Sequence, residues 1–257
     1  MSILFNDIVF GPINSRRFGY SLGINLLPLD NKVCNFNCVY CECGWTDLKN
    51  QKVTYFPYET ICQSIEAAFK SWAQNAKKPE SITFAGNGEP TMHPKFLEIM
   101  KEVIVLRNTY LPGVPITVLS NSELLGNKKV WEGLMLADKR VMKLDAGTND
   151  MFSKINLPLS GKNIEWYSEK LKQFNGDLIV QTIFLKGRHN GDVIDNTTDS
   201  EVDNWLNELK EIKPKEVMIY TIDRDTPLQT LDKIETEKLN AICDKAKGMG
   251  LNAKVYS

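Results

Sequence analysis

Three cysteines lie within one short run, Cys34-Asn-Phe-Asn-Cys38-Val-Tyr-Cys41. Thiolates spaced this closely can bind three irons of a cubane [4Fe–4S] cluster and leave the fourth iron without a protein ligand. An iron with an open position can bind a substrate or cofactor directly, whereas a fully ligated cluster can only transfer electrons. The spacing therefore favours a catalytic iron–sulfur centre.

A structural zinc site, with Cys43 as a fourth ligand, is the alternative chemistry for this run. Structural zinc usually takes two ligand pairs separated by a dozen or more residues, or a mixture of Cys and His. Here the cysteines crowd into one loop, and His93 and His189 are isolated in the sequence. We favour one iron–sulfur cluster, and a zinc-stabilised binding module stays as the alternative outside the enzymes. Cys62 and Cys243 are expected to be packing residues, so no second cluster is expected.

The composition is that of an ordinary globular protein. The 257 residues include 31 Lys and Arg against 32 Asp and Glu, which gives a net charge of −1. This balance disfavours nucleic acid as the partner but leaves a local basic patch open. The beginning of the chain resembles neither a secretory signal nor a transit peptide, and no apolar run approaches the length of a membrane span. Clustered cysteines indicate a metal site in a reducing compartment, so we expect a cytoplasmic protein without a membrane partner.

Short apolar runs alternate with stretches of helical period along the whole chain, which predicts repeated βα units. Strands are expected over 20–27, 81–85, 115–120, 140–145, 177–184 and 216–221, with a short last strand over 251–256. Helices are expected over 61–72, 95–106, 129–137, 162–174, 200–212 and 236–249. Right-handed connections between such units give a parallel sheet, either as an open doubly wound sheet or as a partial barrel. Both place the ligand site at the carboxyl ends of the strands.

The helix over 200–212 opens with a Ser-x-x-Asp pattern, so Ser200 and Asp203 are expected to cap it.

A second motif follows directly after the second predicted strand, in the run Phe-Ala-Gly-Asn-Gly-Glu-Pro-Thr over residues 84–91. Gly86 and Gly88 permit backbone angles closed to other residues and let a ligand come close. Glu89 could bind an ammonium group. The simpler interpretation is a tight βα turn that Pro90 ends. Its position at the same end of the sheet as the cysteine run favours a binding role.

Together these two motifs resemble those of radical S-adenosylmethionine (SAM) enzymes. The family's core motif is CxxxCxΦC, with an aromatic Φ, and it matches Cys34, Cys38, Tyr40 and Cys41. The family's GGEP motif is similar to Gly-Asn-Gly-Glu-Pro here, which is one residue longer. The resemblance implies an α/β fold of the (β/α)6 partial TIM-type barrel kind, with an N-terminal arm over 1–19 and a core over 20–257 in a single domain.

The resemblance also implies roles for individual residues. The three cysteines would ligate one [4Fe–4S] cluster, and SAM would chelate the fourth iron through its amino and carboxylate groups. Further cofactor contacts would come from Tyr40 at the adenine, the turn residues Gly86, Gly88 and Glu89 at the methionine amino group, and Asp145 at the ribose. Which glycine faces the cofactor is open. For Asp145, a helix cap or turn residue is the alternative.

The activity implied by the resemblance is radical chemistry. A flavodoxin- or ferredoxin-like donor would reduce the cluster, and SAM would be cleaved to methionine and a 5′-deoxyadenosyl radical that takes hydrogen from a substrate. The run over 11–25 is most similar to uncharacterised proteins grouped near the wyosine-base synthases, which use additional N-terminal cysteines that this chain lacks. The compact size is equally similar to that of glycyl-radical-enzyme activases, so an activase and a tRNA-base-modifying enzyme stay as alternatives. The substrate, the fate of SAM and the oligomeric state are open.

Four basic residues are candidates for substrate contacts. Lys143 shares a strand face with Asp145, and Arg224 follows the sixth predicted strand. Arg16 and Arg17 precede the first, and arginine pairs suit carboxylate or phosphate groups. Salt bridges on the surface are the alternative for each of these residues.

Overall fold

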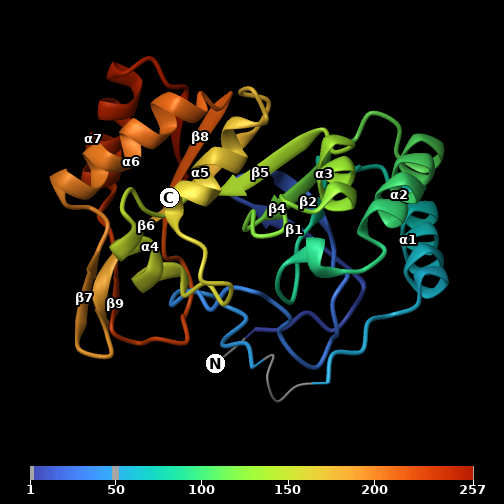
Figure 1. The fold of residues 1–257 in the computed structure, drawn as a ribbon. Helices are drawn as coiled ribbons and strands as arrows, with labels where there is room; N and C mark the ends of the chain where they lie inside the picture. The colour runs from blue at the N-terminus through green and yellow to red at the C-terminus, as the bar shows by residue number, and fades with distance from the viewer. Residues whose placement is uncertain (1–2, 48–51, 257) are drawn as a thin grey trace. The chain divides into compact units, whose positions relative to one another are not determined.

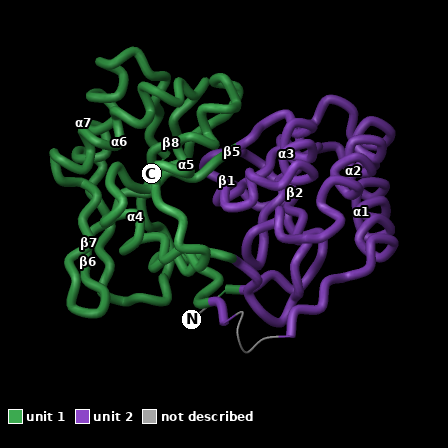
Figure 2. Tube along the Cα trace, in the orientation of Figure 1, with its two compact units in different colours: residues 1–3, 35–45, 141–257 green, residues 4–34, 46–140 purple. Residues whose placement is uncertain are grey.

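The computed structural model describes residues 3–47 and 52–256 of the chain, which divides into two compact units (Figure 2). Unit 1 consists of residues 1–3, 35–45 and 141–257, and unit 2 consists of residues 4–34 and 46–140. The run from Cys34 to Cys41 thus contributes its first cysteine to unit 2 and its other two to unit 1.

Unit 2 is built on the strand order β1-β2-β3-β4, in which β1 is antiparallel to β2 and the other pairs are parallel. Its helices follow the strands in the chain, and α2 packs against both α1 and α3 (Figure 1). The elements are β1 Val9–Ser15, β2 Gly19–Ile24, α1 Tyr58–Ala73, β3 Ser81–Phe84, the 3-10 turn Pro90–Met92, α2 Phe96–Tyr110, β4 Ile116–Ser120 and α3 Lys128–Met135.

Unit 1 contains most of β5 and a parallel set of strands in the order β5-β6-β8-β10. The long strand β6 runs past its parallel neighbours, and its second half pairs antiparallel with β7 and with β9. The elements are β5 Lys139–Lys143, α4 Asn149–Asn156, α5 Ile164–Lys172, β6 Ile179–His189, β7 Asp192–Asp195, α6 Asp199–Ile212, β8 Glu216–Thr221, β9 Leu231–Lys233, α7 Thr236–Gly248 and β10 Ala253–Tyr256.

All the predicted strands and helices are present, with ends shifted by a few residues. The prediction missed β1, β7, β9 and α4. β1 contains Gly11 and Pro12 and lies at the edge of its sheet, so it lacks the alternation of a buried strand. Only Met151, Phe152 and Ile155 are apolar in α4, which is too few to define a helical period.

A buried glutamate ties α6 to the loop after β5. Glu201 lies in the first turn of α6, and its carboxylate accepts hydrogen bonds from the backbone N–H groups of Gly147, at 2.6 Å, and Thr148, at 2.9 Å. A side chain at Gly147 would overlap the backbone of Trp205 in the same helix, since its Cβ would lie 2.1 Å from the Trp205 nitrogen. The loop that carries Asp145 is therefore fixed by close packing on α6.

The predicted cap of α6 is wrong by two residues. The helix begins after Thr198, whose hydroxyl oxygen accepts a hydrogen bond from the backbone N–H of Glu201 at 3.3 Å. Ser200 already lies inside the helix and is exposed. Thr198 and Glu201 have the same spacing as Ser200 and Asp203. The sequence pattern therefore fits a cap at either Thr198 or Ser200.

In the part of the chain that the structure describes, no helix is both long enough and apolar enough to cross a membrane.

We expect Thr198→Ala to lower the free energy of unfolding by about 1 kcal/mol, because one N–H group in the first turn of α6 loses its acceptor. Ser200→Ala, the matched control, should leave stability within about 0.5 kcal/mol of the unmodified protein. Denaturant unfolding measures both. A larger loss for Ser200→Ala than for Thr198→Ala would contradict the cap that the structure assigns.

Candidate functional site

The cysteine run is anchored in unit 1 by the apolar residues that stand between its cysteines. Phe36 is buried and makes edge-to-face contacts with Phe152 of α4 and Tyr167 of α5, at ring-centroid distances of 5.8 and 5.7 Å. Val39 is buried in a hydrophobic cluster with residues of β6 that include Ile183. These two side chains hold the loop in place while the neighbouring cysteines stay available for a metal.

The backbone of the same loop is bound to the end of α4. The N–H of Val39 donates to the carbonyl of Ile155 at 2.9 Å, and Leu159 donates in turn to the carbonyl of Asn35 at 3.0 Å. Leu157 ends α4 in the left-handed conformation, with φ of 43°, which turns the chain alongside the loop. The end of α4 is therefore the main support of residues 35–39.

Cys38 is 6% exposed, and its sulfur lies beside an asparagine from this support. Asn156, the last residue of α4, is fully buried and donates a hydrogen bond from Nδ2 to Cys38 Sγ at 3.4 Å. The same nitrogen donates to Asp145 Oδ2 at 2.8 Å. The thiol of Cys38 is thus connected through one amide to the residue predicted to bind ribose.

Asp145 is the centre of a buried polar cluster. Its Oδ2 accepts from the hydroxyl of Tyr40 at 2.5 Å and from Lys143 Nζ at 3.2 Å, and its Oδ1 accepts from the backbone N–H of Ile183 at 3.1 Å. Lys143 also donates to the Tyr40 oxygen. Three residues that were selected from the sequence for separate roles therefore lie together.

The charges in this cluster are balanced. Burial, together with the negative charge of Asp145, raises the pKa of Tyr40 well above its usual value, so the phenol keeps its proton. Burial is the largest single effect on Lys143 and lowers its pKa, but the combined attraction of Asp145, Cys38 and Tyr220, with the hydrogen bond to Asp145, raises the pKa of the ammonium above its usual value. Lys143 is therefore a cation paired with Asp145.

The Asp145 side chain has no exposed surface. Oδ2 already accepts three hydrogen bonds and Oδ1 accepts one, so only Oδ1 has a lone pair left for a ribose hydroxyl, and neighbouring side chains would have to move to expose it. The ribose contact of Asp145 stays a prediction, as do the adenine contact of Tyr40 and the substrate contact of Lys143.

The glycine turn after β3 lies in unit 2, beside the first cysteine. Gly88 forms a parallel bridge with Val33, and the N–H of Glu89 donates to the Val33 carbonyl at 3.0 Å. A Cβ on Gly88 would lie 1.9 Å from the Val33 oxygen, at a φ of 137°. Gly86 is restricted in a similar way by Asn25, which a Cβ would approach to 2.4 Å. Glycine is required at both positions because other atoms of the protein lie where a Cβ would be.

Asn87 accounts for the extra residue in this turn. Its fully buried side chain accepts from the N–H of Phe5 at 2.8 Å and donates to the carbonyls of Phe5 and Pro28, at 3.0 and 2.9 Å. The inserted residue therefore binds the N-terminal segment to the turn.

Glu89 is buried, and hydrogen-bond donors surround its carboxylate. Oε1 accepts from the hydroxyls of Thr91, at 2.5 Å, and Ser120, at 2.9 Å, and Oε2 accepts from the N–H of Asn121 at 2.7 Å. Burial raises the pKa of this carboxyl above its usual value, and the donors oppose that rise. Glu89 joins the turn after β3 to the end of β4, and its contact with a methionine amino group stays a prediction.

Cys34 has an amide neighbour that corresponds to that of Cys38. Asn121, directly after β4, donates from Nδ2 to Cys34 Sγ at 3.6 Å. Cys34 is 8% exposed and Asn121 is buried. Within each unit, a buried cysteine of the motif therefore has an asparagine N–H group at its sulfur.

The arginines predicted to contact substrate lie in different places. Arg16 and Arg17 form the turn between β1 and β2, which is the amino end of β2, while the glycine turn follows the carboxyl end of the neighbouring parallel strand β3. The structure does not bring them to the glycine turn, which gives their predicted role no support. Arg224, in the loop after β8, forms an exposed ion pair with Glu42 at 2.8 Å, next to Cys41.

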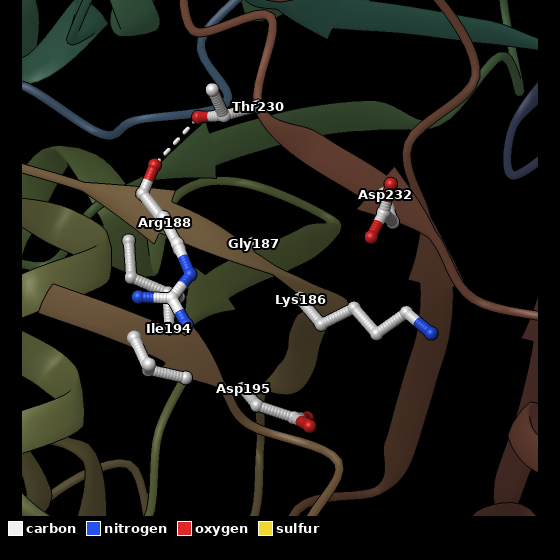
Figure 3. A pocket seen from close by; sticks show the side chains of 8 residues that line it. Lys186, Gly187, Arg188, Ile194, Asp195, Thr230 and Asp232 are labelled. Atoms are coloured by element: carbon white, nitrogen blue, oxygen red, sulfur yellow. Dashed lines mark hydrogen bonds between the residues drawn. The ribbon is translucent and has the colours of Figure 1, made fainter. Parts of the chain in front are cut away.

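A separate surface hollow lies on the antiparallel extension of β6 (Figure 3). Lys186 and Arg188 project from β6 there, with Asp195 from β7 and Asp232 from β9 close by, and Thr230 donates to the Arg188 carbonyl at 2.5 Å. Its acidic and basic groups balance. It contains none of the residues predicted for the cofactor or substrate.

None of the six cysteines, all of which the structure describes, is in a disulfide. Among residues 3–47 and 52–256, no three His, Cys, Asp or Glu side chains are grouped as one metal ion requires. Cysteines on a cubane bind different irons, so they need not converge on one point, and amide donors at sulfur are typical of such clusters.

Sequence reasoning missed the two asparagines at these sulfurs. Asn121 directly follows a predicted strand, so its place at the carboxyl end of the sheet was a usable signal. Asn156 is 118 residues from Cys38 and ends a helix that was not predicted, so the sequence offered no signal for it.

We expect Gly88→Ala to destabilise the protein by about 3 kcal/mol, because the new methyl group would overlap the Val33 carbonyl. Gly113→Ala is the matched control, since Gly113 also has positive φ, of 82°, but has no atom within 4 Å of the added Cβ. Its loss should be about 1 kcal/mol, from backbone strain alone. Equal losses in denaturant unfolding would contradict the close approach of Val33.

Comparisons with known proteins show the family of the chain. The model of the radical SAM superfamily matches residues 31–161, about half of the chain. A UPF0026 protein of Synechocystis is 34% identical over 226 residues, which cover 86% of this chain and 77% of that protein. A protein of Brachyspira hyodysenteriae described as GTPase Obg is 29% identical over 93% of this chain, which spans only 33% of its length.

Solved structures show the fold. A radical SAM methyltransferase from Sphaerobacter thermophilus has a TM-score of 0.64 at 14% identity, covering 91% of this chain and 65% of that one. Native anSMEcpe with bound AdoMet has a TM-score of 0.57 at 15% identity, and the match covers 91% of this chain and 64% of that one. The (β/α)6 partial TIM-type barrel expected from the sequence is confirmed. The chain belongs to the radical SAM superfamily.

Proposed function

We propose that the protein is a radical SAM enzyme that holds one [4Fe–4S] cluster through Cys34, Cys38 and Cys41. The observation that carries this proposal is the pair of buried motif thiols, each of which has an asparagine N–H group at its sulfur. A zinc-stabilised module has no comparable support, because no single-ion ligand group occurs in the described ranges 3–47 and 52–256.

When bound and reduced, such a cluster supplies the electron that cleaves SAM into methionine and a 5′-deoxyadenosyl radical. The chain's own residues hold and orient the segments that carry the cysteines. Phe36 and Val39 fix the loop that carries Cys38 and Cys41, and the Val33–Gly88 bridge fixes the segment that carries Cys34. Burial of Cys34 and Cys38 limits access of water to the sulfurs.

We assign SAM to this site with contacts from Tyr40, the turn of Gly86, Gly88 and Glu89, and the loop of Asp145. Support comes from the family to which the chain belongs and from the matching motifs. Because the side chains of Glu89 and Asp145 already accept several hydrogen bonds each, we expect them to position loop backbone around SAM more than to contact it.

We propose that the reductant is a low-potential flavodoxin- or ferredoxin-like protein. We also propose that the protein acts in the cytoplasm. The substrate class is open, and both a glycyl-radical-enzyme activase and a tRNA-base-modifying enzyme remain alternatives. Arg224 forms an ion pair with Glu42, the residue that follows Cys41. Arg224 therefore stays a candidate substrate contact.

Anaerobic reconstitution with iron and sulfide should give a brown protein that contains about four irons, as a single cubane requires. Dithionite together with SAM should then release 5′-deoxyadenosine, measured by liquid chromatography. One zinc per chain with neither iron nor sulfide, after purification without oxygen, would overturn the proposal.

Cys38→Ala should lose both the cluster absorbance and the release of 5′-deoxyadenosine, because one iron loses its ligand. Cys43→Ala is the matched control, since Cys43 is in the same loop but outside the motif, and it should keep about four irons. Loss of iron in Cys43→Ala with retention in Cys38→Ala would contradict the ligand assignment.

A further inference from the structure

The two asparagine–cysteine contacts have a shared geometry that bears on the proposed cluster. Asn156 Nδ2 lies 3.4 Å from Cys38 Sγ, and Asn121 Nδ2 lies 3.6 Å from Cys34 Sγ. Both distances suit an N–H···S hydrogen bond, because sulfur is larger than oxygen. Both asparagines are buried, so water does not compete for the sulfur-facing N–H groups.

The orientation of the Asn156 amide is fixed by its other contact. Nδ2 also donates to Asp145 Oδ2, so a rotated amide would place its oxygen against a carboxylate. In the present orientation Oδ1 is buried without a hydrogen-bond partner among the described residues. An unpaired buried oxygen is costly, which indicates that the contacts of Nδ2 determine the orientation.

The orientation of the Asn121 amide is fixed as well. Its Oδ1 accepts from the backbone N–H of Glu123 at 3.0 Å, so rotation would place an NH₂ group against an N–H donor. Its own backbone N–H donates to Glu89 Oε2 at 2.7 Å. Glu89, in the glycine turn, therefore positions the residue whose amide faces Cys34.

We propose that Asn121 and Asn156 tune the reduction potential of the cluster, an inference that rests on the proposed function. Reduction adds one electron to the cluster and increases the negative charge on its thiolate sulfurs. An N–H dipole directed at sulfur stabilises the reduced form more than the oxidised form and raises the potential. Both residues are positioning residues that act through the cysteines. They keep the reduction potential of the cluster high enough for a flavodoxin- or ferredoxin-like donor to reduce it.

The test is an EPR-monitored redox titration of the reconstituted protein. Asn121→Leu and Asn156→Leu each remove the donor and keep the number and branching of side-chain heavy atoms, and each should lower the equilibrium constant for reduction about tenfold, a negative shift of about 59 mV. Asn121→Asp keeps an acceptor for Glu123 and should also shift negatively. Asn204→Leu, the matched control on α6, removes an amide that donates only to the carbonyl of Ser200 and should leave the potential unchanged.

A second measurement needs no variant, in case either substitution prevents folding. Protein labelled with ¹⁵N only at the asparagine side-chain amide should show ¹⁵N coupling to the reduced cluster in pulsed EPR. No coupling, or unchanged potentials in both leucine variants with about four irons bound, would overturn the inference while leaving the cluster assignment intact. Failure of the unmodified protein to bind iron would instead overturn the proposed function.

Discussion

The candidate site depends on the need to surround two buried carboxylates with hydrogen-bond donors. A carboxylate removed from water is strongly unfavourable unless donors replace the lost hydration. Glu89 meets this requirement with hydroxyl and N–H groups from its own turn and from the end of β4. Asp145 meets it with donors from the cysteine loop, β5, β6 and the end of α4.

These two carboxylates therefore fix the loops that carry the cysteines and their neighbours. Tyr40 lies between Cys38 and Cys41, so its hydrogen bond to Asp145 fixes the middle of the motif. Phe36 and Val39 supply the apolar contacts that hold the same loop. The residue types in the run thus have separate roles, because the apolar side chains anchor the loop, the phenol joins the polar cluster, and the thiols are the proposed iron ligands.

The sequence predicted the parts of this account that depend on local pattern. Buried strands such as β8 show clear apolar runs, and the cysteine spacing and the glycine turn are compact motifs. The contacts that complete the site join distant residues, such as Asn156 and Cys38, and no local pattern records them. The hydrogen bonds of Asp145 with Tyr40, Lys143 and Asn156 could not be foreseen for the same reason. Arg16 and Arg17 were selected because they precede a predicted strand and because arginine pairs suit carboxylate or phosphate groups, and the structure places them at the amino end of β2.

From membership of the radical SAM superfamily and the motif cysteines, we propose that this chain binds a [4Fe–4S] cluster with one iron open to SAM. EPR of the dithionite-reduced, reconstituted protein, recorded with and without SAM, tests this claim most directly. Coordination of SAM to the open iron should change the g values of the reduced cluster. Identical spectra at saturating SAM, from a protein with about four irons bound, would contradict it.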